Sequence, residues 1–284
     1  MTNAMRSRED DAPVPAEAPA EVSDPPGLTA HAPSPEQVSD PPGPIPRVAP
    51  PVLTSPTSRD FAATETWIFD LDNTLYAAEC NLFAEVDRRM AGFIARYLGV
   101  PLPYARHLQK SYYRQFGTTL SGLMLVHKME PGPFLDYVHD IDISAVAEAP
   151  RLRAAIAALD GRKLIFTNGS RRHAERVAGK LGVLDLMEDI CDIAACKYVP
   201  KPDRAAFDTM LKLHDVRADL AAMFEDMPHN LEAPHALGMT TALVHSSYID
   251  HPSQIAMRKW TALPEHVHHL VHDLAAFLEG LGRQ

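Results

Sequence analysis

The pattern of hydrophobic positions predicts an α/β fold. Short apolar runs typical of buried strands occur at 66–70, 163–167, 190–194, 221–226 and 240–245. Segments with apolar residues at every third or fourth position predict helices at about 171–181, from Pro202 onward, and at about 267–281. Strands that alternate with helices indicate a parallel, doubly wound sheet between two helical layers.

The first predicted strand is followed by a long stretch with no convincing strand. Apolar residues from Leu82 to Tyr97 recur at spacings of three and four, which predicts a helix ending at Gly99. Two more helices are expected at about 104–116 and 119–128, and Pro131-Gly132-Pro133 is expected to break the chain. We therefore expect an all-helical domain over 77–149, inserted into a core made of 63–76 and 150–284.

Residues 1–62 differ in composition from the rest of the chain. They contain 14 of the 25 prolines and no aromatic residue before Phe61. The sequence Val-Ser-Asp-Pro-Pro-Gly occurs at 22–27 and again at 38–43. Too little apolar surface is present to offset chain entropy, so we expect a disordered, partly polyproline tail. Such a tail serves either for docking or as a dispensable extension, and its composition favours the second.

Composition and charge exclude several classes of protein. Of 284 residues, 46% are hydrophobic and 23% are charged, as in a globular protein without membrane spans. The net charge of -10 argues against a nucleic-acid binder, but a small phosphorylated substrate stays compatible with it. Cys80, Cys191 and Cys196 match no zinc spacing, and with no signal peptide the simplest expectation is reduced thiols in the cytoplasm. The oligomeric state is not predicted.

Polar residues stand where the predicted strands end. Because parallel strands end at one edge of a sheet, these residues are expected to converge there. A carboxylate at this edge can attack phosphorus and a second can transfer protons, while a hydroxyl and a lysine bind phosphate oxygens. Carboxylates from two strands can also hold Mg²⁺. The residues concerned are Asp70, Asp72, Thr167, Lys201, Glu225, Asp226 and Asn230.

These residues, in this order, resemble the haloacid dehalogenase-like (HAD) phosphatase superfamily over about 66–280. The four motifs are Asp70-Leu71-Asp72-Asn73-Thr74-Leu75, Thr167-Asn168-Gly169, Lys201-Pro202 and Glu225-Asp226-x-x-x-Asn230. The resemblance implies a Rossmann-like three-layer core, and it identifies the helical insertion as a type 1 cap that covers the site.

The resemblance also implies the role of each residue. Asp70 would be the nucleophile and a Mg²⁺ ligand, and Asp72 the general acid/base, with its main-chain carbonyl on the metal. Thr167, Asn168 and Lys201 would bind the phosphate, and Asp226 would be a direct metal ligand. Asn230 would order a water molecule on the metal, although many relatives have aspartate there. Glu225 is either a ligand through water or only an acid at a strand end.

Within the superfamily the sequence most resembles pyrimidine 5′-nucleotidases. The resemblance includes a segment of the cap, Tyr112-Tyr113-x-x-Phe116-Gly117-Thr118-Thr119-Leu120-x-Gly122-Leu123. It implies hydrolysis of nucleoside 5′-monophosphates such as UMP and CMP. Tyr112, Tyr113 and His127 either contact the base or pack within the cap, and packing is favoured.

Other functions stay open at this point. The substrate would alternatively be nicotinamide mononucleotide, a sugar phosphate or pyridoxal phosphate. A dehalogenase would use Asp70 without a metal, but it has no need for Asp72 or Asp226. A phosphomutase would use the same residues, and a non-catalytic scaffold would act through the proline-rich tail.

Overall fold

The computed structural model describes residue 53, residues 59–246 and residues 251–282. Its centre is a six-stranded sheet in which every neighbouring pair of strands is parallel, with the order β3-β2-β1-β4-β5-β6. The strands are β1 (Thr66–Phe69), β2 (Arg162–Phe166), β3 (Asp189–Cys191), β4 (Ala221–Glu225), β5 (Thr240–Val244) and β6 (His269–Val271). The predicted α/β fold with a parallel sheet is confirmed.

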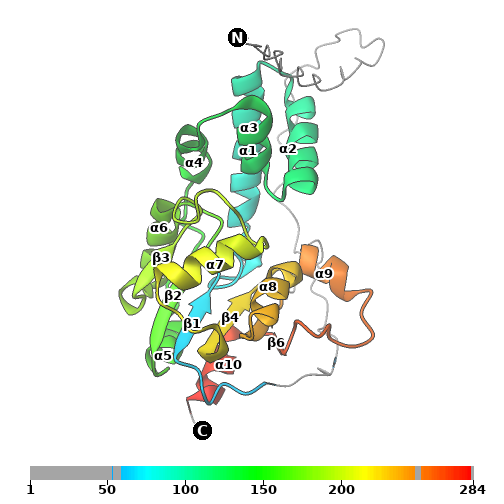
Figure 1. The fold of residues 1–284 in the computed structure, drawn as a ribbon. Helices are drawn as coiled ribbons and strands as arrows, with labels where there is room; N and C mark the ends of the chain where they lie inside the picture. The colour runs from blue at the N-terminus through cyan, green and yellow to red at the C-terminus, as the bar shows by residue number, and fades with distance from the viewer. Residues whose placement is uncertain (1–52, 54–58, 247–250, 283–284) are drawn as a thin grey trace, which may run out of the picture. The chain divides into compact units, whose positions relative to one another are not determined.

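Helices cover both faces of the sheet (Figure 1). Along β4, Ala222 and Phe224 belong to the core shared with α5 (Pro150–Ala157), α6 (Arg171–Leu181) and α10 (Leu274–Leu281). Ala221 and Met223 belong to the second core, with α7 (Arg204–Leu213) and α8 (Glu232–Ala236). Because side chains alternate along a strand, each buried strand contributes to both cores, as expected for a doubly wound sheet. A further helix, α9 (Pro252–Met257), follows β5.

Four helices follow β1 in the inserted segment, which we call the cap. They are α1 (Leu82–Leu98), α2 (Leu102–Phe116), α3 (Thr119–His127) and α4 (Pro131–His139). The expected break at Pro131-Gly132-Pro133 is wrong, because Pro131 is the first residue of α4. Proline is tolerated there because the first N–H groups of a helix have no partner within the helix.

Two other expected elements differ from the structure. In place of a helix over about 267–281, the chain forms β6, which pairs with β5, and then α10, whose N-cap Asp273 accepts from Ala276 N. A strand of three residues is too short to be distinguished from a helical turn by its pattern. The helix expected from Pro202 begins instead at Arg204, and the Lys201–Pro202 peptide bond is cis.

Most of the predicted proline-rich tail, 1–52 and 54–58, lies outside the described residues, and its disorder stays a prediction. The described end of that segment belongs to the core. Phe61 stacks on Trp67 with ring centroids 5.7 Å apart and also contacts Phe224 and Phe277. Within the described ranges, no helix combines the length and the apolar character needed to cross a membrane.

Candidate active site

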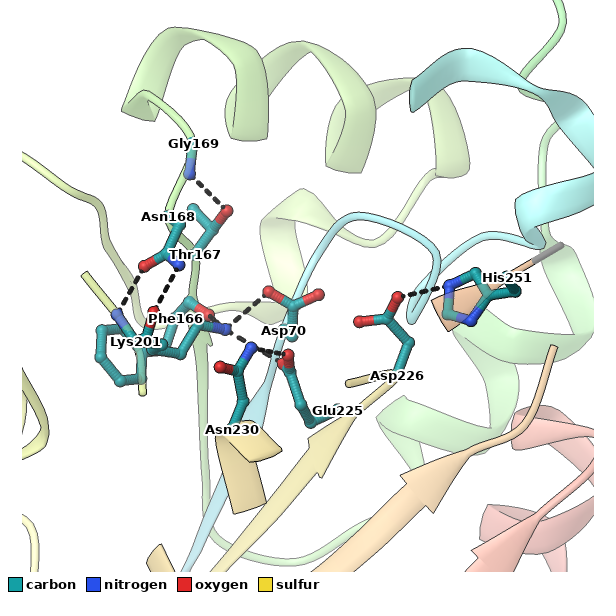
Figure 2. A network of polar contacts seen from close by, with 10 residues as sticks. All are labelled: Asp70, Phe166, Thr167, Asn168, Gly169, Lys201, Glu225, Asp226, Asn230 and His251. Atoms are coloured by element: carbon teal, nitrogen blue, oxygen red, sulfur yellow. Dashed lines mark hydrogen bonds and ion pairs between the residues drawn. The ribbon is translucent and has the colours of Figure 1, made fainter. Parts of the chain in front are cut away.

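The site lies where the central strands end. Asp70 directly follows β1, Thr167 follows β2, and Glu225 is the last residue of β4. Since β1 pairs with both β2 and β4 in parallel register, these three residues leave the sheet at the same edge. The polar groups predicted from the strand ends therefore meet, as Figure 2 shows.

Lys201 is the buried cation of this edge. Its Nζ donates to Asp70 Oδ1 at 2.7 Å, to Glu225 Oε2 at 3.0 Å and to the main-chain oxygen of Phe166 at 2.8 Å. Burial alone would lower the pKa of Lys201, but the two carboxylates raise it above its ordinary value. The side chain is 2% exposed, so it carries a fixed positive charge inside the protein.

Asn168 fixes the main chain of Lys201. The Asn168 Oδ1 accepts from Lys201 N at 2.8 Å, and Asn168 Nδ2 donates to Lys201 O at 3.1 Å. The sequence suggested Asn168 as a phosphate ligand. In the structure the side-chain amide of Asn168 holds the main chain of Lys201, which lies 33 residues later in the sequence.

Three buried acids lie close together beside Lys201. Asp70, Glu225 and Asp226 each offer an oxygen, and these oxygens lie within 4.8 Å of one another. Burial and the charge of Glu225 raise the pKa of Asp70 to about 7, and burial also raises the pKa of Glu225 to about 7. A buried carboxylate with a raised pKa lacks enough positive charge nearby. The three carboxylates with their hard oxygen donors therefore fit a divalent cation such as Mg²⁺.

Hydrogen bonds already use one oxygen each of Asp70 and Asp226. Lys201 occupies Asp70 Oδ1, and His251 occupies Asp226 Oδ2. Their second oxygens turn toward each other in Figure 2. Glu225 differs, because Lys201 takes one of its oxygens and Asn230 Nδ2 the other. Asp70 and Asp226 are thus better suited than Glu225 to be direct metal ligands.

His251 is a residue that the sequence pattern missed. Its Nε2 lies 2.9 Å from Asp226 Oδ2, and its Nδ1 lies 2.6 Å from Ser253 Oγ. His251 is buried at the N-cap of α9, where it holds one side of the Asp226 carboxylate. The carboxylate is thereby oriented before any metal binds.

Asp72 lies in different surroundings from Asp70. Its Oδ1 is 2.6 Å from the Tyr76 hydroxyl and 2.8 Å from His173 Nε2. Burial alone would raise the pKa of Asp72, but the charge and hydrogen bond of His173 lower it to about 2. Burial and the nearby carboxylate raise the pKa of Tyr76 well above its ordinary value, so the phenol remains a donor. Neither partner was expected from the sequence.

The loop after β2 forms the start of α6 at the same edge. Thr167 Oγ1 accepts from Gly169 N at 2.9 Å, and Ser170 caps the helix by accepting from His173 N. A Cβ at Gly169 would lie 3.2 Å from Thr167 Oγ1, so glycine permits this close approach. Main-chain N–H groups at a helix start favour an anion.

The aromatic residues of the cap divide into two roles. The hydroxyl of buried Tyr112 lies 2.6 Å from His127 Nε2, so this pair packs within the cap, as favoured from the sequence. Tyr113 is half-exposed, and its pKa is raised by partial burial and by the charges of Asp226 and Glu225. Tyr113 therefore lies close enough to the core for the charges of these acids to act on its hydroxyl group.

A cavity of about 660 Å³ opens beside this edge. Its walls are the segments 73–80, 145–149, 244–246 and 272–275, together with Leu152 and Leu181. Asp70, Asp72 and Lys201 are not among the lining residues, so the cavity is separate from the convergent acids.

Comparisons with known proteins identify the family of this chain. Residues 64–238 match the family described as haloacid dehalogenase-like hydrolase. Phosphate metabolism protein 8 of Saccharomyces cerevisiae is 28% identical over an alignment 213 residues long, which covers 68% of this chain and 64% of that protein. A HAD phosphatase from Thermococcus onnurineus shares the fold at a TM-score of 0.51, with 15% identity over 77% of this chain and 98% of its own. An L-2-haloacid dehalogenase from Xanthobacter autotrophicus has a TM-score of 0.45, with 13% identity over 76% of this chain and 97% of its own.

Proposed function

Because this chain belongs to the haloacid dehalogenase-like hydrolase family, we propose that it is a Mg²⁺-dependent phosphatase of small phosphomonoesters. The observation that carries the proposal is the group of buried acids Asp70, Glu225 and Asp226 beside the buried cation Lys201. A site that binds a phosphate dianion needs more positive charge than one lysine supplies. A divalent cation held by the acids would provide it.

In this proposal Asp70 attacks phosphorus and forms an acyl phosphate while the bond to the leaving oxygen breaks. Asp72 gives a proton to that oxygen, then takes one from the water that hydrolyses the acyl phosphate. Its low pKa suits the second step, and the charge of an incoming phosphate dianion would raise this pKa for the first. Lys201 and the loop of Thr167 bind the remaining phosphate oxygens.

Asp70 and Asp226 would hold the Mg²⁺ directly, with the main-chain carbonyl of Asp72 as a further ligand. Asn230 would bind a water of the metal's shell, since its Oδ1 is buried without a partner among the described residues. When bound, Mg²⁺ neutralises the acids and stabilises the charge that develops on the phosphate.

Phosphatase chemistry is favoured over dehalogenation by the second acid. A dehalogenase needs neither Asp72 nor the excess of carboxylates that calls for a metal. The name of the yeast relative, a phosphate metabolism protein, is compatible with a phosphorylated substrate. The test is release of inorganic phosphate from a panel of phosphomonoesters with and without Mg²⁺, beside chloride release from 2-chloropropionate. Phosphate release that needs Mg²⁺ is expected, and metal-independent chloride release alone would refute the proposal.

We further propose that the substrates are pyrimidine nucleoside 5′-monophosphates. This rests on the resemblance of the cap segment Tyr112–Leu123. It is supported by Tyr113, which lies close enough to the site to respond to Asp226 and Glu225. The end of α2 also lies beside the segment of Lys201, because a Cβ at Gly117 would be 3.9 Å from Pro200 Cγ. From this end of α2, the ring of Tyr113 would stack on the base of the nucleotide.

The substrate proposal is tested by comparing UMP and CMP with nicotinamide mononucleotide, sugar phosphates and pyridoxal phosphate. Tyr113→Ala should raise KM for UMP roughly 10-fold, the loss of about one base-stacking contact, and leave KM for a small alkyl phosphate unchanged. Tyr104→Ala is the matched control, because Tyr104 is also exposed on α2. It lies about 13 Å from Tyr113 along the helix axis. A preference for another phosphomonoester, or equal effects of both variants, would contradict the nucleotide assignment.

A further inference from the structure

The two oxygens of the Asp72 carboxylate have different neighbours. Oδ1 lies 2.6 Å from the Tyr76 hydroxyl and 2.8 Å from His173 Nε2. Oδ2 faces the loop after β2, where a Cβ added at Gly169 would be 3.7 Å from it and 3.2 Å from Thr167 Oγ1. Oδ2 is therefore the oxygen on the side of the phosphate-binding loop.

Both neighbours of Oδ1 donate to it. The phenol of Tyr76 has its hydrogen available for the nearest carboxylate oxygen. The Nδ1 atom of His173 is buried and has no partner among the described residues. The Nε2 atom lies 2.8 Å from a carboxylate oxygen, which accepts, so Nε2 carries a proton and donates it to Oδ1.

The two donors are themselves held firmly. Tyr76 is 7% exposed and His173 is 1% exposed. The ring of His173 stacks on that of His139, the last residue of α4 in the cap, with centroids 4.6 Å apart and an interplanar angle of 17°. His139 is fixed in turn, since its Nδ1 lies 3.0 Å from Ser170 Oγ. Neither donor can follow Asp72 easily if that carboxylate rotates.

We propose that Tyr76 and His173 are positioning residues that hold Oδ1 of Asp72 and reserve Oδ2 for proton transfer. The inference rests on the proposed phosphatase activity and adds to it. As the bond from Asp70 to phosphorus forms and the bond to the leaving oxygen breaks, the electron pair stays on that oxygen. The leaving oxygen takes the proton from Asp72 Oδ2. Asp72 Oδ2 then accepts a proton from the water that attacks phosphorus, and the bond between phosphorus and Asp70 breaks, which releases phosphate and restores the starting state.

A purely structural role would have a different consequence. If the two bonds only stabilised the fold, removing one would slow all substrates by the same factor. If they aim Oδ2, the loss depends on how much the leaving group needs a proton. An alkyl alcohol leaves poorly without one, whereas p-nitrophenolate leaves as a stable anion.

The experiment compares kcat/KM of Tyr76→Phe and His173→Leu on an alkyl phosphomonoester that the wild type cleaves and on p-nitrophenyl phosphate. We expect kcat/KM to fall roughly 10- to 100-fold on the alkyl ester and less than about 3-fold on the aryl ester. The first value is part of the rate gain that general acid catalysis supplies. KM should stay unchanged. His173→Gln keeps an N–H donor of similar reach and should recover most of the activity that His173→Leu loses.

Tyr112→Phe is the matched control, because Tyr112 is also a buried tyrosine with its hydroxyl 2.6 Å from a histidine nitrogen, away from Asp72. The Tyr112→Phe variant should not change the ratio of kcat/KM between the alkyl ester and p-nitrophenyl phosphate. Equal losses of Tyr76→Phe on both substrates, in an enzyme whose wild type is active, would overturn the positioning role alone. A wild type that cleaves no phosphomonoester would instead refute the proposed function.

Discussion

Replacing Asp70 by asparagine should stabilise the metal-free protein above pH 7 while it abolishes turnover. Asp70 is buried beside Glu225, and Lys201 is the cation that its carboxylate contacts. Asparagine keeps the shape of the side chain and can still accept from Lys201 through its amide oxygen. It removes the buried negative charge that the fold otherwise has to hold.

The magnitude follows from the pKa of Asp70, which burial and Glu225 raise from 3.8 to about 7. A difference of about 3 units between the folded and unfolded chains corresponds to about 4 kcal/mol, at 1.36 kcal/mol per unit. Because the folded pKa is the higher one, the folded wild type holds its proton more tightly. The free energy of unfolding that the protonated Asp70 contributes is fully present below about pH 4. This contribution is lost as the pH rises to 7. The advantage of the variant should therefore be small at pH 4 and reach about 4 kcal/mol above pH 7.

The assay is urea unfolding in a chelating buffer at several pH values between 4 and 8.5. Asp136→Asn is the control, because Asp136 is exposed on α4 and its replacement should change little at any pH. Saturating Mg²⁺ should stabilise the wild type more than the variant, since only the wild type has the full set of acids. A variant that is no more stable than the wild type at pH 8 without metal would refute the argument that this site carries uncompensated charge.

Three further substitutions probe other parts of the structure. His251→Leu should weaken Mg²⁺ binding roughly 10- to 100-fold, measured by calorimetry, because it removes the group that orients Asp226; unchanged affinity would contradict this role. Gly122→Ala should lower the free energy of unfolding by about 1–3 kcal/mol, since its Cβ would overlap with Tyr112; an unchanged urea midpoint would show that the cap repacks freely. Lys201→Met should destabilise the protein by about 3–5 kcal/mol at pH 8, because it leaves two buried carboxylates without their cation; a loss of similar size at pH 4 would indicate a packing effect instead.

The convergence of the site was predictable because it depends on the strands alone. Apolar runs end at Asp70, Thr167 and Glu225, and parallel strands bring such ends to one edge. The helical insertion was predictable from its spacing of apolar residues. The sixth strand was not, because β6 has three residues and lies in a stretch whose pattern also suits a helix.

The contacts that orient the acids could not be read from these patterns. His251 reaches Asp226 from the segment after β5, 25 residues along the chain, and nothing in the spacing of its neighbours marks it. His173 is 101 residues from Asp72. Its position in the first turn of α6 is the one available signal, since a helix that begins at the loop after β2 directs its first residues toward the site.

The environments of Asp70 and Asp72 explain how two carboxylates two positions apart can take different tasks. The chain turns after Asp72, where Asn73 has a positive φ of 63°, and the two side chains enter separate surroundings. Asp70 lies among other acids, and burial and Glu225 raise its pKa to about 7. Asp72 lies between two donors, and its pKa falls to about 2. Environments that push neighbouring pKa values apart in this way are what acid/base chemistry requires. In the proposed mechanism a bound metal would lower the pKa of Asp70 and leave it ionised for attack, while the donors on Asp72 would keep it a base until the charge of the substrate arrives.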